Sequence, residues 1–294
     1  MLVFCILAHH NPQALTRLLQ KLANFYVVVH LDKNVEIENF RSEIPASMEV
    51  YWLEGNARIS TNWGGWSIVQ AQIELMKFAY SRFSQLSQIV FLSGECFPLY
   101  PITQFIQFVS TKKSTINTQL IKNNNLLGTS DKFLFKRISR FHPMDFRFFS
   151  KYKNRATSFY KVCGIPSKIL RYLNLPNPGF NPAENYYYGS QWIALNLKQI
   201  KFLLKSFENM RKEFRFTYAP DELAFHSILA RASLADVMLS QDDPIRKPPF
   251  HVINQNLSQE WTLEKFLRTE FTSSWFIRRP CHEIIHYLET EHGV

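Results

Sequence analysis

The sequence predicts an α/β protein in which helices flank a sheet. Apolar runs of strand length alternate with amphipathic helical patterns through residues 1–110. Hydrophobic residues make up 46% of the 294 positions and charged residues 20%, which is typical of a globular chain. No apolar run reaches the roughly 18 residues of a membrane-spanning helix.

The first strand–helix–strand unit is the clearest. Residues 2–8 (LVFCILA) are a continuous apolar run, and residues 25–31 (FYVVVHL) are rich in β-branched and aromatic side chains. Between them, Asn11-Pro12 opens a helical pattern. Its apolar face consists of Leu15, Leu18, Leu19 and Leu22. Such a unit is typical of a parallel sheet.

The alternation continues with variation. We expect strands at residues 48–53 and 88–92, and helices at residues 66–80 and 101–110, the last begun by Pro101. The chain has no GxGxxG and no GxxxxGK[ST] segment, so a Rossmann dehydrogenase and a P-loop enzyme are both poorly supported.

The second half is less regular. Residues 173–189, which contain three prolines, predict a loop at the mouth of a site. Residues 190–207 predict a strand followed by a helix, and residues 220–231 a further helix. We expect residues 241–262 to be irregular and the last 30 residues to be helical.

The charge balance is basic, since 34 Lys and Arg outnumber 24 Asp and Glu and give a net charge of +10. Such an excess favours phosphate-bearing partners. Residues 132–161 hold nine Lys or Arg, one Asp and nine Phe or Tyr. This stretch fits a solvated helical face whose aromatic side chains cover the core, and it equally fits the anion-binding wall of a cleft.

Pro220-Asp221-Glu222 also has two interpretations. Carboxylates in the first turn of a helix are stabilised by its dipole, so simple capping explains the spacing. Alternatively, one of the carboxylates is a general base held on a rigid element.

Two aromatic and basic segments are candidate ligand contacts. In Ser60–Ser67, two glycines between two tryptophans permit close backbone approach, and indole faces can hold a base or a sugar. Paired Arg278 and Arg279 suit a diphosphate, because guanidinium groups match its oxygens. A tight turn with core tryptophans and a solvated charge pair are the ordinary alternatives.

His282-Glu283-Ile284-Ile285-His286 matches the HExxH motif of zinc proteases. Only eight residues follow it, which leaves little room for a third ligand, so we interpret the match as accidental. Four cysteines lie far apart in the sequence, and we expect them to be reduced thiols of a cytosolic protein. They are Cys5, Cys96, Cys163 and Cys281.

Seven segments in order resemble glycosyltransferase family 14, which comprises core-2/I-branching β-1,6-N-acetylglucosaminyltransferases and peptide O-xylosyltransferases. The resemblance covers nearly the whole chain. The segments are Ala8-His9-His10, Val29-His30-Leu31-Asp32, Thr61-Asn62-Trp63-Gly64-Gly65, Phe91-Leu92-Ser93-Gly94-Glu95-Cys96-Phe97-Pro98-Leu99, Gly189-Ser190-Gln191-Trp192, Tyr218-Ala219-Pro220-Asp221-Glu222 and Phe276-Ile277-Arg278-Arg279.

The resemblance implies a GT-A-like fold, a mixed sheet flanked by helices in a single catalytic domain of residues 1–294. It implies a nucleotide-binding half at residues 1–110 and an acceptor-binding and catalytic half at residues 111–294. It further implies inverting transfer from a UDP-sugar, without a metal or other cofactor. The absence of any Asp-x-Asp segment agrees with this expectation.

The resemblance assigns roles residue by residue. Glu222 is the expected general base, and Arg278 and Arg279 neutralise the leaving diphosphate. Ser258 is expected to contact the diphosphate as well. The other expected donor-binding residues are Ala8, Asp32, Thr61, Asn62 and Trp63 for the uridine, with Gln191 and Trp192 near the sugar. No acceptor-binding residue is assigned.

Four departures from the family pattern affect these roles. Asn254-Gln255 occupies the region where relatives carry an Asp-Trp pair, so we expect acceptor binding to differ. Cys96 stands where relatives have Asp, so that contact is lost or replaced. Gln191 replaces the Asp of the xylosyltransferases, which favours GlcNAc over xylose as the donor sugar. Arg279 replaces the usual Lys, which keeps the charge and changes its geometry.

The expected partners are a UDP-sugar and a glycan or lipid-linked glycan acceptor, with no nucleic acid. The N-terminal residues have no basic segment and no cleavage site, so we expect a bacterial, cytoplasmic enzyme that contacts the inner face of the membrane peripherally. The alternatives are UDP-xylose-dependent transfer and, from another class, a polyanion- or nucleic-acid-binding module built on residues 132–161.

Overall fold

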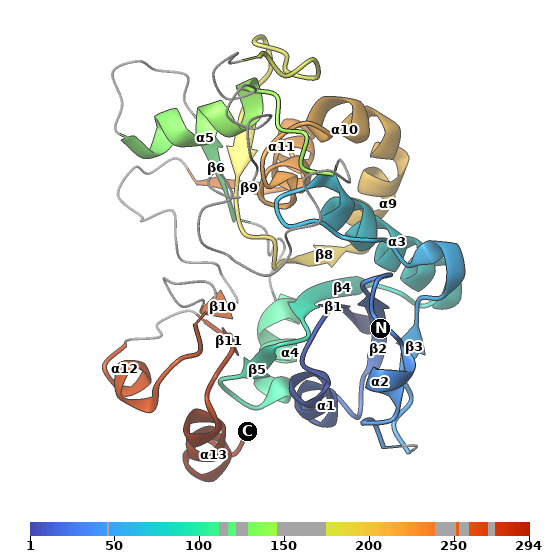
Figure 1. The fold of residues 1–294 in the computed structure, drawn as a ribbon, viewed down its shortest axis with the longest axis vertical. Helices are drawn as coiled ribbons and strands as arrows, with labels where there is room; N and C mark the ends of the chain where they lie inside the picture. The colour runs from blue at the N-terminus through green and yellow to red at the C-terminus, as the bar shows by residue number, and fades with distance from the viewer. Residues whose placement is uncertain are drawn as a thin grey trace.

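A five-stranded mixed sheet forms the centre of the molecule, in the order β3-β2-β1-β4-β8 (Figure 1). The computed structural model describes residues 1–45, 47–111, 117–121, 129–145, 175–238, 251–252, 259–269 and 274–294. The strands are β1 (Leu2–Ala8), β2 (Tyr26–Leu31), β3 (Tyr51–Trp52), β4 (Gln88–Ser93) and β8 (Ala194–Asn196). All pair in parallel except β8, which is antiparallel to β4. The predicted α/β class, with a mixed sheet flanked by helices, is therefore confirmed.

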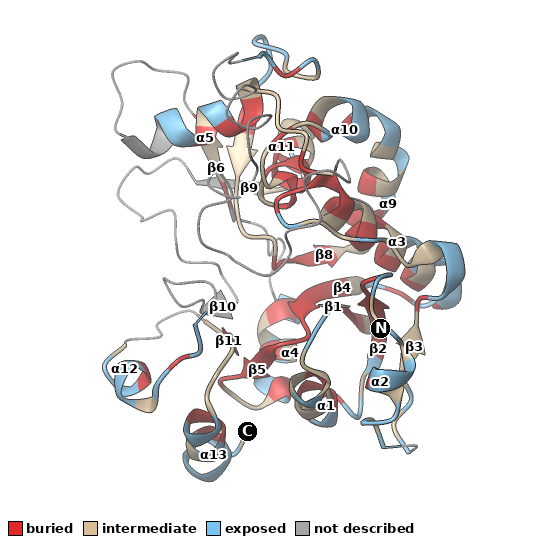
Figure 2. Cartoon of the chain, in the orientation of Figure 1, coloured by how far each residue is buried: buried red, intermediate tan, exposed pale blue. Residues whose placement is uncertain are grey.

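The apolar run of β1 is continuous because both faces of the strand are covered. Val3 and Cys5 belong to a core cluster with α3 (Trp66–Arg82). Phe4 and Ile6 point to the opposite cluster, with α1 (Pro12–Lys21) and α4 (Ile102–Thr111). A parallel strand between two helical layers needs apolar side chains on both faces. Figure 2 accordingly shows the central strands as buried.

The first-half predictions are confirmed, with shifted ends. Asn11 caps α1, and its side chain accepts a hydrogen bond from the backbone of Ala14 at 3.0 Å. The helix expected at residues 66–80 extends to Arg82. The strand expected at residues 48–53 pairs with β2 only at Tyr51–Trp52. A short α2 (Glu38–Arg41) and a 3₁₀ turn at Gly55–Ala57 connect these elements.

A second, three-stranded sheet has the order β7-β6-β9. Its strands are β6 (Asn117–Ile121), β7 (Tyr186–Tyr188) and β9 (Asp236–Met238). The helices beside it are α5 (Thr129–Ser139), α9 (Leu197–Lys205), α10 (Phe207–Phe214) and α11 (Ala224–Arg231). The prediction of a loop through residue 189 is wrong at its end, where β7 pairs with β6. The strand and helix predicted in residues 190–207 are confirmed as β8 and α9.

The C-terminal prediction of continuous helix is wrong. Strand β11 (Phe276–Arg278) precedes α13 (His282–Glu291), and α12 (Leu263–Leu267) is short. Phe276 and Ile277 are fully buried, because β11 pairs antiparallel with β5 (Cys96–Pro98) and parallel with β10 (His251–Val252). Most of residues 241–262, expected to be irregular, lie outside the described residues.

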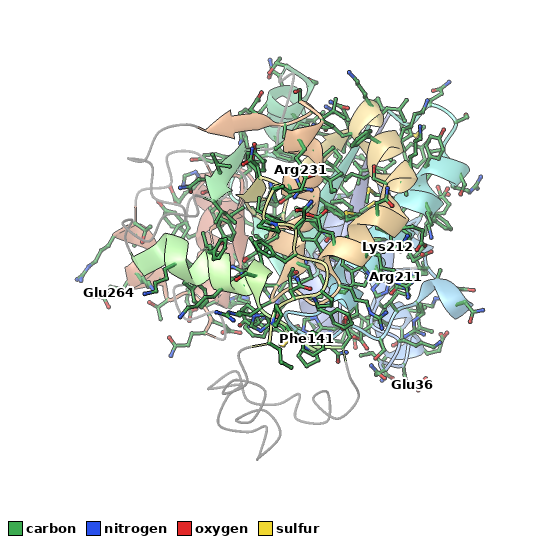
Figure 3. The ribbon with its side chains drawn as sticks, turned by 90° about the horizontal axis from the view of Figure 1, so that it is seen from above. Glu36, Phe141, Arg211, Lys212, Arg231 and Glu264 are labelled. Carbon is green, nitrogen blue, oxygen red and sulfur yellow. The ribbon has the colours of Figure 1, made fainter. Side chains whose placement is uncertain are left out.

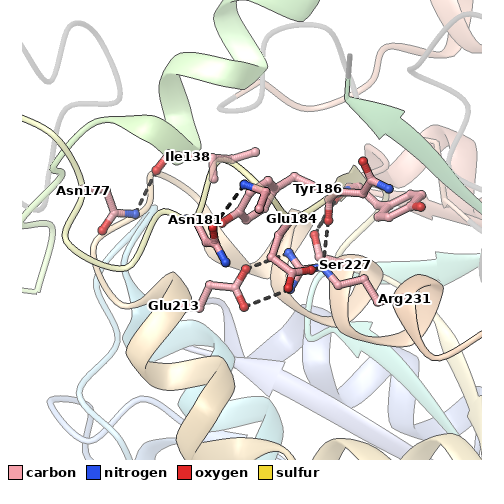
Figure 4. A network of polar contacts seen from close by, with 11 residues as sticks. Ile138, Asn177, Asn181, Glu184, Tyr186, Glu213, Ser227 and Arg231 are labelled. Atoms are coloured by element: carbon pink, nitrogen blue, oxygen red, sulfur yellow. Dashed lines mark hydrogen bonds and ion pairs between the residues drawn. The ribbon is translucent and has the colours of Figure 1, made fainter. Parts of the chain in front are cut away.

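A polar network fastens β7 to its surroundings (Figure 4). Arg231 of α11 binds both carboxylate oxygens of Glu213, at 2.7 and 3.0 Å. The backbone N–H of Tyr187 donates to Ser227 Oγ at 2.9 Å, and that of Asn181 donates to the hydroxyl of Tyr186 at 2.9 Å. These bonds fix the end of β7, from which the chain enters the candidate site.

Charged side chains at the edge of the molecule point outward. Figure 3 shows this for Glu36, Arg211, Lys212 and Glu264, all of which are exposed. Among the described residues, no helix is both long and apolar enough to cross a membrane.

Candidate active site

The candidate site lies at the carboxyl ends of parallel strands. Ala8 ends β1, Asp32 follows β2, and Glu95 is the second residue of the two-residue turn that follows β4. Because the carboxyl ends of parallel strands share one edge of a sheet, these three residues gather there. Ligands of open α/β sheets bind at this edge.

Asp32 organises the first part of the site. Its backbone N–H donates to Ala8 O at 3.0 Å. The buried carboxylate accepts the backbone N–H of Thr61 at 2.9 Å, and it also binds the Thr61 hydroxyl. On the other side it accepts from the backbone and the amide of Asn34, at 2.9 and 2.8 Å. Three of the predicted uridine contacts, Ala8, Asp32 and Thr61, are thus brought together.

Asp145 holds the next segment, and sequence reasoning missed it. Its carboxylate accepts the backbone N–H of Ser67 at 3.1 Å and the Ser67 hydroxyl at 2.6 Å, so it caps the start of α3 from outside the helix. It also accepts from Asn62 Nδ2 at 3.3 Å. A Cβ at position 65 would lie only 2.2 Å from Asp145 Oδ1. This close approach explains why Gly65, the second glycine of the segment, carries no side chain. The available signal was that Asp145 is the one acidic residue of the basic stretch.

Trp63 stands at the surface of the site with 61% of its area exposed. Its ring meets Tyr218 edge to face, with 5.6 Å between centroids. Gly64 has a φ of +73°, and its carbonyl accepts the backbone N–H of Ala219 at 2.9 Å. The Trp63 segment therefore joins the Asp32 region to the turn that carries Glu222.

Glu222 ends a 3₁₀ turn, Pro220–Glu222, and does not lie on α11. The predicted continuous helix over residues 220–231 is wrong, because the chain breaks at Leu223. Arg137 Nη2 donates to Glu222 Oε2 at 2.7 Å. The Glu222 side chain remains 33% exposed, so its carboxylate is only partly covered. This geometry fits a carboxylate that is accessible to a ligand better than a carboxylate that caps a helix.

Arg137 is buried and fixes the whole turn. Its Nε donates to Tyr218 O and its Nη2 to Ala219 O, both at 3.0 Å. The guanidinium carbon lies 5.5 Å from the ring centroids of both Tyr188 and Tyr218. Ala219 is held at a φ of +49°, a left-handed conformation that costs free energy in a non-glycine residue.

Asp221, beside Glu222, is a buried carboxylate with a different environment. The pKa of Asp221 is raised to about 7. Burial is the largest cause, the negative charge of Glu222 adds to it, and the positive charge of Arg137 opposes it. Oδ1 has no hydrogen-bond partner within the described residues. A carboxyl in this environment holds its proton well above the usual range.

The segment after β7 rests on His226. Gly189 N–H donates to Glu222 O at 3.0 Å, and any Cβ on Gly189 falls 2.3 Å from His226 Cε1. Since a carbonyl only accepts, the His226 Nε2 that lies 2.8 Å from Ser190 O carries a hydrogen. Burial lowers the pKa of His226 to about 4, so the ring is neutral.

Gln191 and Trp192, predicted near the donor sugar, follow this segment. The backbone carbonyl of Gln191 accepts from Gln72 Nε2 at 3.3 Å. Trp192 is only 5% exposed and belongs to the core cluster that includes α3. Trp192 therefore supports the segment from behind rather than presenting its ring at the surface.

Arg278 and Arg279 converge on a buried carboxylate. Glu95 Oε2 lies 2.7 Å from Arg279 Nε and 3.4 Å from Arg278 Nη2. His10 Nε2 lies 2.8 Å from Glu95 Oε1. Burial alone raises the pKa of Glu95, but the His10 hydrogen bond and the positive charges lower it to about 2. Glu95 is therefore ionised.

This cluster explains the departure at Cys96. In the β5–β11 ladder Arg278 lies directly opposite Cys96, which is buried. A carboxylate is present one residue earlier, at Glu95, where the resemblance led us to expect one at position 96. Arg278 Nε is buried and has no hydrogen-bond partner within the described residues, which leaves a donor for a ligand.

The basic-aromatic stretch is described only to residue 145. Phe135 packs on Phe180 and Phe141 on Phe216, which agrees with the core-covering interpretation, whereas Phe133 is 59% exposed. Arg137, however, belongs to the candidate site. The rest of the stretch, residues 146–161, lies outside the described residues. So do Asn254-Gln255 and Cys163, as well as Ser258, which was expected to contact the donor.

His282 and His286 of the HExxH match are both exposed on α13. Within the part of the chain that the structure describes, no group of three or more His, Cys, Asp or Glu could hold a metal ion. The described cysteines, Cys5, Cys96 and Cys281, form no disulfide bond with one another.

Comparisons with solved structures show only distant similarity. HddC from Yersinia pseudotuberculosis, complexed with GMP-PN, aligns with a TM-score of 0.29 and 16% identity, over 41% of this chain and 58% of that one. Mouse xyloside xylosyltransferase 1, in its apo form, aligns with a TM-score of 0.33 and 12% identity, over 80% and 85%. The match thus spans less than two thirds of HddC, and both scores are too low to support an argument. No curated protein sequence matches the chain.

The sequence comparison is more informative than these alignments. The family model described as Branch, Core-2/I-Branching enzyme, matches residues 2–243. That range includes the strands of the main sheet, Asp32, Glu95 and the Glu222 turn. The chain therefore belongs to the Core-2/I-Branching enzyme family.

Proposed function

We propose that the enzyme transfers GlcNAc in β-1,6 linkage from a UDP-sugar to a glycan hydroxyl, with inversion and without a metal ion. The observation that carries this proposal is the Glu222 carboxylate, which is fixed through Oε2 by Arg137 while its side chain stays 33% exposed. A general base needs this combination of fixed position and access.

Glu222 is the general base of the proposed reaction. Its carboxylate takes the proton of the acceptor hydroxyl while the hydroxyl oxygen attacks the anomeric carbon of the donor. The bond from that carbon to the UDP oxygen breaks on the opposite face, and its electron pair leaves with UDP. Arg137 prevents the carboxylate from rotating away, because the guanidinium also holds the carbonyls of Tyr218 and Ala219.

Arg278 and Arg279 are the proposed stabilisers of the leaving diphosphate. Fixed positive charge is effective where negative charge develops, because no reorganisation is needed during the reaction. The unpartnered Nε of Arg278 supports this role. The absence of Asp-x-Asp from the sequence supports charge neutralisation by these arginines instead of a metal. Asp32, Thr61, Asn62 and Trp63 are the proposed uridine contacts.

The sugar assignment rests on Gln191, which replaces the Asp of the xylosyltransferases, so UDP-xylose is the second candidate donor. We further propose a cytoplasmic enzyme that contacts the membrane peripherally and acts on a glycan or lipid-linked acceptor. The net charge of +10 supports attraction to anionic surfaces. A basic module that binds polyanions without catalysis is the rival from another class.

Calorimetric titration with nucleotides and UDP-sugars in excess EDTA tests the donor site, with R278A/R279A as the control. We expect UDP-selective binding that the double variant loses, and the sugar that binds most tightly identifies the donor. Equal binding of all polyanions supports the rival module. Transfer assays with E222Q test the base, since the variant should bind the donor normally and lack activity.

A further inference from the structure

His10 makes two contacts that a single protonation state cannot satisfy. Its Nε2 lies 2.8 Å from Glu95 Oε1 and 3.2 Å from Arg279 Nη2. The residue follows β1, and its side chain is 43% exposed. It therefore stands at the solvent side of the arginine cluster.

The two contacts require opposite states of the same nitrogen. An ionised carboxylate only accepts, so the bond to Glu95 requires a hydrogen on Nε2. A guanidinium only donates, so the bond from Arg279 requires a lone pair on Nε2. A neutral imidazole can make either bond, according to which nitrogen carries the hydrogen, whereas a protonated imidazole carries hydrogen on both nitrogens and can make only the Glu95 bond. Protonation of His10 therefore excludes the hydrogen bond from Arg279 Nη2.

The charge of the cluster changes in the same direction. With His10 neutral, the charges of Arg278, Arg279 and Glu95 sum to one positive charge. With His10 protonated, the cluster carries two positive charges. The diphosphate of a nucleotide sugar carries two negative charges, so the protonated cluster matches it.

We propose that His10 is a further binding residue for the donor diphosphate, and that the site takes up a proton on His10 when the donor binds. The proton comes from solvent and adds to the imidazole. His10 then holds Glu95, and Arg279 turns its released donor toward a phosphate oxygen. This inference deepens the proposed function and rests on it, because the ligand is the donor diphosphate of that site.

Several charged groups surround His10. The ring of His9 meets it edge to face, with 4.0 Å between ring centroids. Loss of water around His9 and the positive charges of His10 and Arg278 lower the pKa of His9 to about 4, while Glu95 and Asp32 oppose this. Glu95 is ionised and the arginines remain charged. Histidine side chains change charge between about pH 5 and 8.

Proton uptake predicts that donor affinity rises as the pH falls. One linked proton changes the affinity by at most about tenfold for each pH unit. We expect UDP-GlcNAc to bind wild-type protein about tenfold more tightly at pH 6 than at pH 8. UDP-GlcNAc is the suitable probe, since neither of its phosphates titrates in this range. Titrations in two buffers with different ionisation enthalpies should also detect proton uptake at pH 7.

Two substitutions separate the contributions of charge and hydrogen bonding. The glutamine of H10Q can still donate a hydrogen bond to Glu95, but its amide cannot be protonated. The variant should therefore bind UDP-GlcNAc weakly and equally at both pH values. H10K carries a permanent charge and cannot accept from Arg279, so it should bind tightly at both. H286A changes an exposed histidine of α13 and should retain the wild-type pH response. Circular dichroism at each pH checks that every variant is folded.

The outcomes distinguish this inference from the proposed function. Donor binding with no pH dependence in the wild type, or with the same dependence in H10Q, overturns the role of His10 and leaves the donor site intact. No binding of UDP-GlcNAc or UDP-xylose to wild type or H10K at either pH overturns the donor site itself, and the role of His10 with it.

Discussion

Arg137 donates to Glu222 across 85 residues of sequence, with 2.7 Å between Nη2 and Oε2. One end of this ion pair lies on α5 and the other on a three-residue 3₁₀ turn. The same guanidinium binds two backbone carbonyls of the approach to that turn. A basic residue of α5 thus determines where the candidate base points.

Replacing Arg137 tests this relationship. R137Q should lower kcat by about 100-fold, because a misplaced base loses the advantage of fixed orientation. The KM for the donor should change little, since Arg137 contacts Glu222 and not the arginine cluster. R137K restores a charge without the fork of donors and should recover only part of the loss. A donor KM that rises while kcat holds would assign Arg137 to donor binding instead.

Gly189 is predicted to be intolerant of a side chain. G189A places a Cβ 2.3 Å from the buried ring of His226, and the overpacking should cost about 1–3 kcal/mol of unfolding free energy. Urea denaturation measures the loss. G55A is the matched control, because a Cβ there meets nothing within 4 Å and only its left-handed backbone adds a cost. Adding H226A to G189A should relieve the clash, and equal losses in single and double variants would argue against it.

Glu95 should stabilise the folded protein at neutral pH. Its pKa of about 2 lies below the ordinary value of 4.5, so its contribution is complete above about pH 4.5 and is lost as the pH falls toward 2. E95Q leaves Arg278 and Arg279 without their carboxylate and should cost about 2–3 kcal/mol at pH 7. The difference from wild type should shrink in acid. Denaturation at pH 7 and pH 3.5 measures both values, and a constant difference would contradict the ionised state of Glu95.

Asp221 should have the opposite effect of pH. Its folded pKa of about 7 exceeds the ordinary 3.8, so between these values the folded state binds more protons than the unfolded state. Stability then falls as the pH rises through this window. The asparagine of D221N does not titrate, so the variant does not lose stability over this range as the wild type does. Its stability relative to wild type should therefore increase by about 2–4 kcal/mol between pH 4 and 7, at about 1.4 kcal/mol for each unit of pKa shift.

The exposed carboxylate of Asp236 supplies the control for this prediction. D236N should show the same pH dependence of the denaturation midpoint as wild type. If D221N and D236N follow the same curve, the carboxyl of Asp221 is ionised in the folded protein at neutral pH.

The elements that the sequence predicted well are those whose burial is decided locally. Residues 2–8 are apolar at every position, which only a strand covered on both faces requires, and β1 has that environment. Asn11-Pro12 begins α1 through a cap within its own first turn. The failures lie where long-range contacts decide. Phe276–Arg278 is a strand because β5 and β10 pair with it, and nothing in those three residues indicates a partner so far away.

The same division applies to the site. The sequence by itself determined the candidate residues Asp32, Glu222 and Arg278, because short motifs carry the types and spacing of the side chains. Only the tertiary structure decided their partners. Arg137 binds Glu222, Glu95 binds the two arginines, and His10 lies beside Glu95 and Arg279. Hydrogen bonds and ion pairs act over about 3 Å, and only the folded chain brings residues from distant segments to that distance.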